Sequence, residues 1–338
     1  MTKEEILNTL KAVKYPPYSK DIVSFGMVKY VKTDGSRAEV RIFTGGEKEA
    51  AKKVVLEATK VLEAAYPNAK FDVVLLAEDP AKAQAPAPKN ETLAGVKMKI
   101  AVASGKGGVG KTTVAVNLAK ALAEIFSKGG EAQVGLMDCD IHGPSAAILM
   151  GEKVFPSVTP DEKIVPPTID GIKVMSMGML VDDDQPLIWR GPMVTSAIKQ
   201  FAEQSEWGEL DAMVIDLPPG TGDAVLSVVQ IIPLDGALIV STSNKLAATT
   251  AARGAMVFEK SGVRILGVLE NMAYFQMPDG SKEYVFGEGF ADEAARKLGT
   301  EVVARIPIDK SLQSGNPSEA SRKIFLELAR KISDALKK

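Results

Sequence analysis

One glycine-rich stretch constrains the fold of this chain more than any other feature. Residues 104–113 read Ser-Gly-Lys-Gly-Gly-Val-Gly-Lys-Thr-Thr. They fit the phosphate-binding loop (P-loop) pattern, in which a glycine is followed, after four residues, by Gly-Lys-Thr. An apolar run at 99–103 precedes this loop, and a run typical of a helix at 111–127 follows it. This strand, loop and helix context predicts an α/β domain and argues against a glycine-rich turn that binds nothing.

The residues of the P-loop have the chemistry that phosphate binding requires. Glycines let successive backbone N–H groups converge on phosphate oxygens. Lys111 adds a positive charge, and the Thr112 hydroxyl can complete the coordination shell of Mg²⁺. The predicted nucleotide-binding residues of the loop are Gly105, Lys106, Gly107, Gly108, Val109, Gly110, Lys111, Thr112 and Thr113. The two lysines, Lys106 and Lys111, are also predicted to be catalytic.

Length and charge limit the classes of function that are open. The 338 residues are enough for a domain of about 250 residues with a small addition. The formal net charge of −2 gives no attraction toward nucleic acid, so no nucleic-acid partner is expected. No apolar run approaches the roughly 18 residues of a membrane span, and the first residues have no signal-peptide character. With one cysteine, Cys139, no intrachain disulfide can form, and we expect a cytoplasmic protein.

The first part of the chain predicts a small α+β domain over residues 1–77. Apolar spacing and turn signals predict, in order, a helix, two strands, a helix and a strand over 3–13, 26–32, 37–43, 47–65 and 70–76. Residues 78–95 are rich in Ala and Pro and cannot bury a core, so they are predicted to form a semi-extended linker.

The remaining residues, 96–338, alternate strands with helices. The predicted strands cover 99–103, 133–137, 172–177, 212–215, 236–241, 264–269 and 301–305, and the predicted helices cover 111–127, 192–204, 224–232, 246–261, 291–298 and 318–337. Several strands are continuous apolar runs, as expected when helices cover both faces of a parallel sheet. We therefore predict an α/β fold with a doubly wound, mostly parallel sheet, which binds its ligand at the carboxyl ends of the strands.

Two acidic residues follow the second strand of this domain. Asp138 and Asp140 are two residues apart, so in extended chain they point to the same side. Our hypothesis is that Asp140 is catalytic and orients or deprotonates the attacking water, whereas Asp138 holds Mg²⁺ through water. The alternative is that both carboxylates cap the following helix.

A third acid ends the apolar strand at 212–215. Asp216 occupies the position of a Walker B acid, which would bind the Mg²⁺ shell. The loop after it, 217–223, contains Gly220, whose N–H is predicted to contact the γ-phosphate and to sense hydrolysis. An ordinary strand-to-helix turn is the alternative.

A second lysine, Lys106, lies inside the P-loop, where a standard loop needs none. With it, residues 105–113 resemble the deviant Walker A motif of the MinD/ParA/nitrogenase iron-protein class. Within that class the chain is similar to the Mrp (ApbC-like) family of iron–sulfur cluster carrier ATPases. The similarity spans nearly the whole chain and rests on residues 104–113, 138–145, 189–193, 207–211, 216–223 and 270–272, with a small-domain match at 20–28.

The resemblance implies a mechanism and partners. Lys106 would contact the nucleotide of the facing subunit, so that ATP closes a homodimer and hydrolysis loosens it; a monomer that uses Lys106 in its own site is the alternative. Asn271 and the segment 306–309, with Pro307, would border the adenine, unless they are an ordinary loop Asn and a strand-ending turn. A [4Fe–4S] cluster, and iron–sulfur assembly or client proteins as partners, are implied in the same way.

The chain departs from this family where the cluster is held. Mrp proteins usually carry a Cys-x-x-Cys pair after the Asn-Met dipeptide, and two subunits together supply four thiolates. Here Met277 and Gly280 occupy those positions, so no iron–sulfur ligand is predicted. Cys139 would give a symmetric dimer only two thiols and is interpreted as a small buried residue.

These patterns and the resemblance predict a Mg²⁺-dependent, ATP-hydrolysing homodimer that works in iron–sulfur protein maturation. The missing cysteines argue against direct carriage of the cluster by this chain. The alternative is a nucleotide-switched positioning or scaffolding ATPase that acts by binding a partner. A membrane-bound version of it would use an apolar stripe near the C-terminus, formed by Phe325, Leu328, Ile332 and Leu336. A non-catalytic homologue is disfavoured because the P-loop and the strand-ending acids are intact.

Overall fold

The computed structural model describes residues 1–15, 21–34, 37–44, 48–76, 92–127, 133–140, 143, 145–151, 154–179, 191–220 and 222–337. Contacts divide the chain into two compact units, Met1–Lys89 and Asn90–Lys338. Each unit has its own buried core: one apolar cluster lies in the first unit, and two lie in the second.

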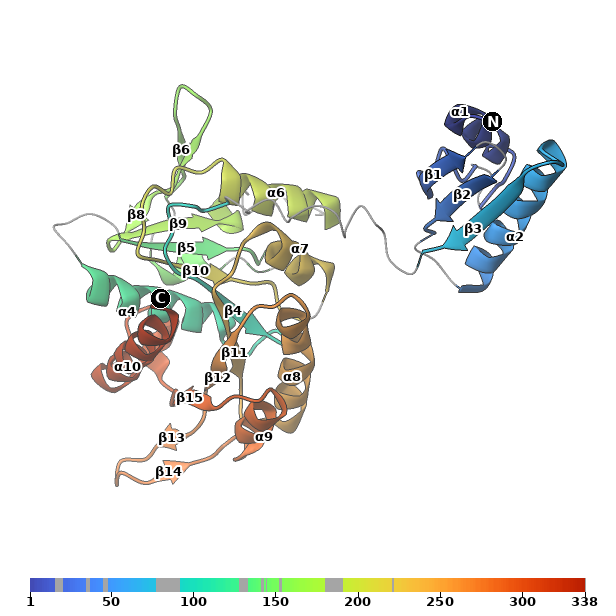
Figure 1. Ribbon diagram of the computed structural model, residues 1–338. Helices are drawn as coiled ribbons and strands as arrows, with labels where there is room; N and C mark the ends of the chain where they lie inside the picture. Colours follow the sequence, from blue (N-terminus) through green and yellow to red (C-terminus); the bar gives the residue numbers. More distant parts are fainter. Residues whose placement is uncertain are drawn as a thin grey trace. The chain divides into compact units, whose positions relative to one another are not determined.

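The first unit is a three-stranded sheet with two helices. Its elements are α1 (Lys3–Leu10), β1 (Val28–Asp34), β2 (Arg37–Ile42), α2 (Lys48–Ala65) and β3 (Lys70–Leu75). Strand β2 lies in the middle, antiparallel to β1 and parallel to β3 (Figure 1). The predicted order of elements is confirmed, but α1 ends earlier than predicted. After Leu10, the N–H groups of residues 11–13 donate to carbonyls three residues back, which is a turn and not an α-helix, and the Val13 carbonyl then accepts a hydrogen bond from the Ile22 N–H.

The second unit is built on an eight-stranded sheet in the order β15-β12-β11-β4-β10-β5-β9-β8. Its strands are β4 (Lys99–Ser104), β5 (Val134–Asp138), β8 (Thr168–Ile169), β9 (Ile172–Ser176), β10 (Ala212–Asp216), β11 (Gly236–Ser241), β12 (Ile265–Glu270) and β15 (Val302–Arg305). All neighbours are parallel except β8, which runs antiparallel to β9 at one edge. The predicted mostly parallel sheet is confirmed.

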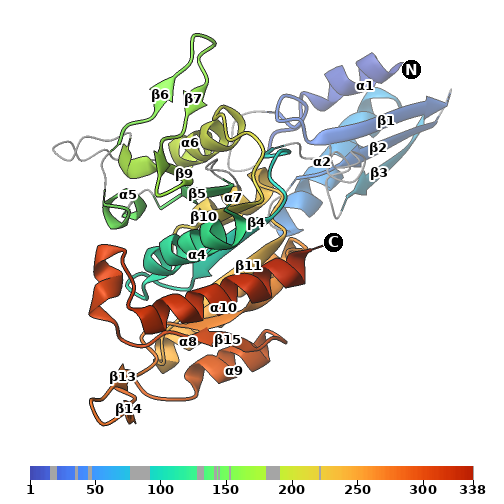
Figure 2. The same ribbon diagram turned by 90° about the vertical axis from the view of Figure 1, so that its left-hand side faces the viewer.

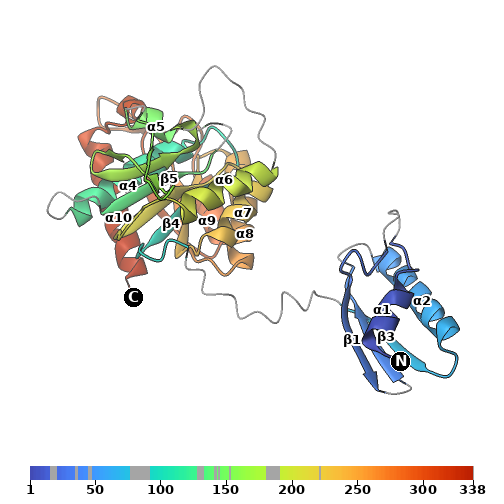
Figure 3. The same cartoon turned by 90° about the horizontal axis from the view of Figure 1, so that it is seen from above.

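Helices cover both faces of this sheet. One apolar cluster packs the sheet against α4 (Lys111–Phe126), α5 (Ala146–Leu149) and α10 (Glu319–Leu336). The other packs it against α6 (Gly191–Glu203), α7 (Asp223–Ile231), α8 (Lys245–Lys260) and α9 (Phe290–Lys297). Figure 3 shows the two groups of helices on opposite sides of the strands. The predicted doubly wound arrangement is therefore confirmed.

Several short elements were not predicted. They are the hairpin strands β6 (Ser157–Val158) and β7 (Ile164–Val165), the hairpin strands β13 (Phe275–Gln276) and β14 (Lys282–Glu283), edge strand β8, helix α5, and the 3₁₀ turns η1 (Met177–Met179) and η2 (Lys310–Ser314). Two-residue strands and single helical turns are too short to produce a hydrophobic period, so the sequence carries no signal for them.

The apolar stripe near the C-terminus packs into the domain core. Phe325, Leu328 and Ile332 are buried in the cluster that contains α4, and α10 lies along α4 (Figure 2). This stripe is therefore not available as a membrane-binding face, contrary to the membrane-bound alternative. Among the described residues, no helix is long and apolar enough to cross a membrane.

The predicted linker ends earlier than expected. Residues 77–91 lie outside the described residues. Residues 92–95 form a turn that belongs to the second unit, because Leu93 is buried in its core and the Gly95 carbonyl accepts a hydrogen bond from the Leu210 N–H. A side chain at Gly95 would meet the Gly208 carbonyl oxygen at 2.6 Å, so this close approach requires glycine. The apolar side chain of Leu93 thus anchors the start of the second unit.

Candidate functional site

Three central strands bring the predicted site residues together. Strand β10 pairs with β4 on one side and with β5 on the other, and Asp216 stands in register with Asp138. The P-loop follows β4 directly and leads into α4 (Figure 1). Because the carboxyl ends of parallel strands lie at the same edge of the sheet, the P-loop and the acids at the strand ends are neighbours there.

The P-loop wraps the first turn of α4. Gly108 and Gly110 have φ values of 78° and 80°, a conformation that favours glycine. A Cβ atom at Gly107 or Gly108 would meet no heavy atom within 4 Å, so the front of the loop is open, whereas at Gly105 it would lie 2.2 Å from the Thr250 backbone. The N-terminus of α4 has no side-chain cap, and such a helix start attracts anions. The open loop thus has the shape of a phosphate cradle.

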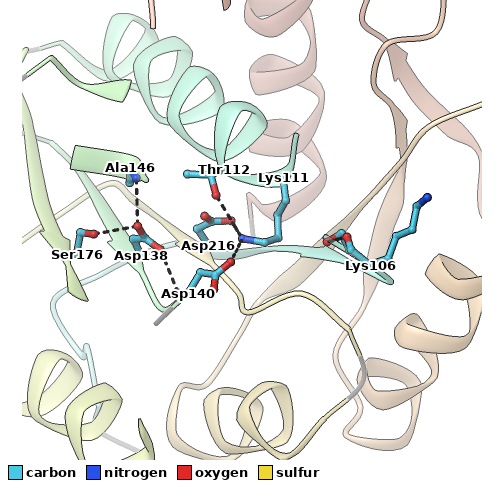
Figure 4. Close-up of polar contacts among 9 residues, drawn as sticks. Lys106, Lys111, Thr112, Asp138, Asp140, Ala146, Ser176 and Asp216 are labelled. Atoms are coloured by element: carbon cyan, nitrogen blue, oxygen red, sulfur yellow. Dashed lines mark hydrogen bonds and ion pairs between the residues drawn. The ribbon is translucent and has the colours of Figure 1, made fainter. Parts of the chain in front are cut away.

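Lys111 lies between two carboxylates behind this cradle (Figure 4). Its Nζ atom is 2.6 Å from Asp216 Oδ1 and 3.8 Å from Asp140 Oδ2. All three residues are buried. The Thr112 hydroxyl lies 3.5 Å from the same Nζ. Within the described part of the chain, Asp140 Oδ1 and Asp216 Oδ2 are buried oxygens that have no hydrogen-bond partner. Such oxygens are rare in folded proteins and are usually satisfied by a bound water or an ion.

Burial changes the acidity of these groups. Burial and the nearby Asp216 charge raise the pKa of Asp138 to about 7. Burial also raises the pKa of Asp216, although the Lys111 charge opposes that shift. A cation bound beside these carboxylates would relieve both penalties because it favours their ionised forms.

Asp138 is more deeply integrated in the fold than the other acids. Its carboxylate accepts hydrogen bonds from the Asp140 N–H (3.0 Å), the Ala146 N–H (3.2 Å) and the Ser176 hydroxyl (2.9 Å). Ala146 is the first residue of α5, so for Asp138 the capping alternative describes the observed contacts. Ser176 was not predicted as part of the site; its position at the end of β9, beside β5, is the signal that could have identified it.

Lys106 takes no part in the cluster around Lys111. Figure 4 shows its side chain pointing away from the two carboxylates. Its backbone carbonyl accepts a hydrogen bond of 3.0 Å from the Ser104 hydroxyl. The structure therefore separates the two lysines of the loop: one is buried among acids, and the other points outward.

Gly220 makes a backbone contact with the end of β4. Its N–H donates to the Ser104 carbonyl oxygen at 2.9 Å, and the contact of this N–H with a γ-phosphate stays a prediction. The loop after β10 is thus joined to the last residue of β4. In this conformation, the backbone hydrogen bond satisfies the N–H that the prediction assigns to the ligand.

Asn271 contacts the P-loop directly. Its Nδ2 donates to the Val109 carbonyl oxygen at 2.9 Å, and a Cβ atom at Gly110 would lie 2.2 Å from that nitrogen. Pro307 lies in the segment after β15, where Ile306 and Ile308 donate backbone hydrogen bonds to Glu270 and Tyr274. Both predicted adenine neighbours therefore belong to segments that meet beside the loop.

The positions of the missing cysteines form a hairpin. Met277 and Gly280 lie in the turn between β13 and β14, and the Gly280 N–H donates to the Met277 carbonyl. Cys139 is fully buried, and burial raises the pKa of its thiol well above the usual value. The described residues contain no group of three or more His, Cys, Asp or Glu side chains that could hold a metal ion.

Comparisons with known proteins identify the family of this chain. Residues 95–337 match a family model described as ParA: NUBPL iron-transfer P-loop NTPase. An iron–sulfur cluster carrier protein from Synechocystis is 36% identical, over 98% of this chain and 97% of the relative. A nucleotide-binding protein from Archaeoglobus fulgidus, solved with ADP, is 39% identical with a TM-score of 0.57, over 70% of this chain and 90% of its own.

A second solved structure, the cell-division ATPase MinD from Pyrococcus furiosus, shares the fold. Its TM-score is 0.51 at 23% identity, over 71% of this chain and 99% of its own. The resemblance inferred from the sequence is thus confirmed. The family model covers most of the chain and the carrier-protein relative covers nearly all of it, so this chain belongs to the family of NUBPL iron-transfer P-loop NTPases.

Proposed function

We propose that this protein binds ATP with Mg²⁺ and hydrolyses it. The observation that carries the proposal is the group formed by Lys111, Asp140 and Asp216 behind an open glycine loop, in which two buried carboxylate oxygens have no partner among the described residues. A buried unpaired oxygen is costly, and a hydrated cation would satisfy it.

The residues fit a magnesium ion without a protein cage. Mg²⁺ in nucleotide sites keeps several waters and takes only one or two protein ligands beside the phosphates. Thr112 and Asp216 would supply them, since the hydroxyl and the carboxylate both lie beside Lys111. Asp138 would reach the ion only through water, because its carboxylate already accepts three hydrogen bonds. When bound, the ion supplies positive charge to the phosphate oxygens.

Asp140 would orient the attacking water. Its unpartnered Oδ1 can accept a proton or a hydrogen bond, while Oδ2 faces Lys111. In Asp140→Asn, we expect ADP affinity within about threefold of the parent and a loss of phosphate release of about 10²-fold or more. Equal loss of binding and turnover would instead show that Asp140 acts only through the fold of the loop.

We also propose that ATP closes a homodimer through Lys106. The lysine points away from its own carboxylate cluster, so its charge is available to a facing nucleotide (Figure 4). With Asp140→Asn to slow turnover, ATP should convert the protein from monomer to dimer in light scattering after gel filtration. Adding Lys106→Gln should abolish this conversion. A dimer that persists with Lys106→Gln would refute the role in the partner's site.

The proposed process is iron–sulfur protein maturation. The support comes from the family and from the carrier-protein relative. The residues do not provide a four-thiolate cluster site: the chain has one cysteine, and that cysteine is buried. Fe–S clusters are held by thiolates, so we propose that the protein acts on partners that carry the thiolates themselves. A reducing compartment such as the cytoplasm is the location that this role requires.

Anaerobic reconstitution with iron and sulfide tests this role. We expect no stoichiometric iron and no cluster absorbance on the parent protein, and the same result for Cys139→Ser. Stoichiometric iron that disappears in Cys139→Ser would refute the proposal and establish direct carriage. The partner class is tested separately, by ATP-dependent capture of a purified thiolate-bearing cluster scaffold.

A further inference from the structure

A buried carboxylate beside the P-loop has no role in the proposed reaction. Glu270 is the last residue of β12, and its side chain is 4% exposed. The Ser243 hydroxyl donates to Oε1, and Arg305 Nε donates to Oε2 at 2.8 Å. Both carboxylate oxygens are therefore engaged, which makes the residue a fixed point at the carboxyl edge of the sheet.

The strand register creates this arrangement. Glu270 stands in register with Ser241 of β11 on one side and with Arg305 of β15 on the other. Arg305 also donates from Nη2 to both oxygens of Asp292 on α9, at 2.7 and 2.6 Å. Guanidinium pairs of this kind are directional, so Arg305 holds Glu270 in one orientation.

The next residue connects this fixed point to the P-loop. The Asn271 N–H donates to the Ser241 carbonyl at 2.8 Å, and its side chain donates to the Val109 carbonyl. Met272 then adopts φ 54°, a left-handed conformation that is uncommon for a residue with a side chain. Such a turn persists only where the surroundings hold it.

Backbone hydrogen bonds hold the turn on its far side. The Ile306 N–H donates to the Glu270 carbonyl, and the Ala273 N–H donates to the Ile306 carbonyl, both at 2.8 Å. The Asn271 amide then fills the space in front of Gly110, where a Cβ atom would clash with it. Gly110 is the N-cap of α4, so the amide sits at the phosphate-binding end of that helix.

We propose that Glu270 is a positioning residue for nucleoside diphosphate binding. Its carboxylate holds the strained turn 270–272, the turn aims the Asn271 amide at Val109, and the amide keeps the P-loop in its phosphate-binding shape. The inference rests on the proposed nucleotide binding, and it adds a residue whose two carboxylate oxygens are already engaged by Ser243 and Arg305. The rival explanation is that Glu270 only joins β12 to β15.

A double-mutant cycle on ADP affinity separates the two explanations. The proteins are the parent, Glu270→Gln, Asn271→Ala and the double variant, with Glu293→Gln, an exposed acid on α9, as the charge-removal control. Calorimetric titration with ADP should show about 10-fold weaker binding for each single variant, as for other residues that orient binding groups. If Glu270 acts through Asn271, the double variant should bind within about twofold of Asn271→Ala, and the control should match the parent.

Steady-state kinetics of ATP hydrolysis provide a second test of the positioning role. Glu270→Gln should raise the KM for ATP about tenfold with kcat nearly unchanged, because it alters the shape of the binding loop and not the reacting groups. Independent losses that multiply in the double variant, or an ADP affinity equal to that of the parent, would overturn the positioning role while leaving nucleotide binding intact. A parent protein that binds no ADP would overturn the proposed function as well.

Should Glu270→Gln fail to fold, Ser243→Ala provides the same test. It removes one hydrogen bond to the carboxylate and leaves the Arg305 contact in place. We expect about threefold weaker ADP binding that disappears in the Asn271→Ala background. Unchanged affinity in this variant would likewise refute the positioning role.

Discussion

Replacing Lys111 with methionine should destabilise the protein as well as inactivate it. The lysine is buried and pairs with Asp216 at 2.6 Å and with Asp140 at 3.8 Å. Methionine keeps much of the side-chain volume but leaves two buried carboxylates without a counter-charge. Breaking a buried ion pair on one side costs about 3–5 kcal/mol. For a unit of this size, that cost corresponds to a fall in Tm of roughly 6–20 °C.

The loss should depend on pH. Burial already raises the pKa of Asp216, and Lys111 opposes that shift, so removing the lysine raises this pKa further. A carboxyl group whose folded pKa is raised destabilises the fold increasingly as pH rises above its unfolded value, because the ionised form must then be buried. The difference in stability between the parent and Lys111→Met should therefore be larger at pH 8 than at pH 5.

Differential scanning calorimetry of the nucleotide-free proteins measures both effects. The control is Lys111→Met combined with Asp216→Asn, which removes the charge left behind and should recover most of the lost Tm. Neither variant should bind ATP with parent affinity. If Lys111→Met melts with the parent at pH 8, the electrostatic account of this site is wrong.

Three further predictions concern other parts of the structure. Because the pKa of Asp138 is raised to about 7, the free energy of unfolding should fall by roughly 3 kcal/mol between pH 4 and pH 7 on its account. Asp138→Asn should flatten that slope in urea titrations, and an unchanged slope would refute the assignment. Gly110→Ala should abolish ADP binding in calorimetric titrations, since the new Cβ would lie 2.2 Å from Asn271 Nδ2 at φ 80°; parent affinity would show that the loop adapts. Leu328→Ala should lower stability by about 2–5 kcal/mol because the side chain is 1% exposed, whereas Glu327→Ala on the exposed face should change it by less than about 0.5 kcal/mol. Urea midpoints measure both, and equal effects would contradict the buried stripe.

The long elements could be predicted because each carries a local signal. The strands that flank the P-loop are continuous apolar runs, and the observed β11, Gly236–Ser241, matches its predicted bounds. The topology alone predicts that the P-loop and the acids at the strand ends are neighbours, since the carboxyl ends of parallel strands lie at one edge of the sheet. For this reason the sequence predicts that Lys111, Asp140 and Asp216 lie at the same edge of the sheet, and the structure places Lys111 between the two carboxylates.

The remaining features depend on contacts between distant residues. The Asp138 carboxylate accepts hydrogen bonds from the Ala146 N–H and the Ser176 hydroxyl, and the residues around position 138 carry no pattern that predicts those partners. Asn271 reaches Val109 across 162 positions of the chain. The Gly220 N–H donates to the Ser104 carbonyl at the end of a strand that is distant in the sequence. Such hydrogen bonds depend on how distant segments pack, so a sequence pattern can predict that a residue belongs to the site but not which residue it contacts.

Release of phosphate from ATP tests the central claim most directly. Parent protein and Lys111→Ala should be assayed side by side, with Mg²⁺ and with EDTA, at ATP concentrations above KM. We expect steady turnover by the parent with Mg²⁺ and none above background for Lys111→Ala or with EDTA. Equal phosphate release by the two proteins would contradict the site built around Lys111.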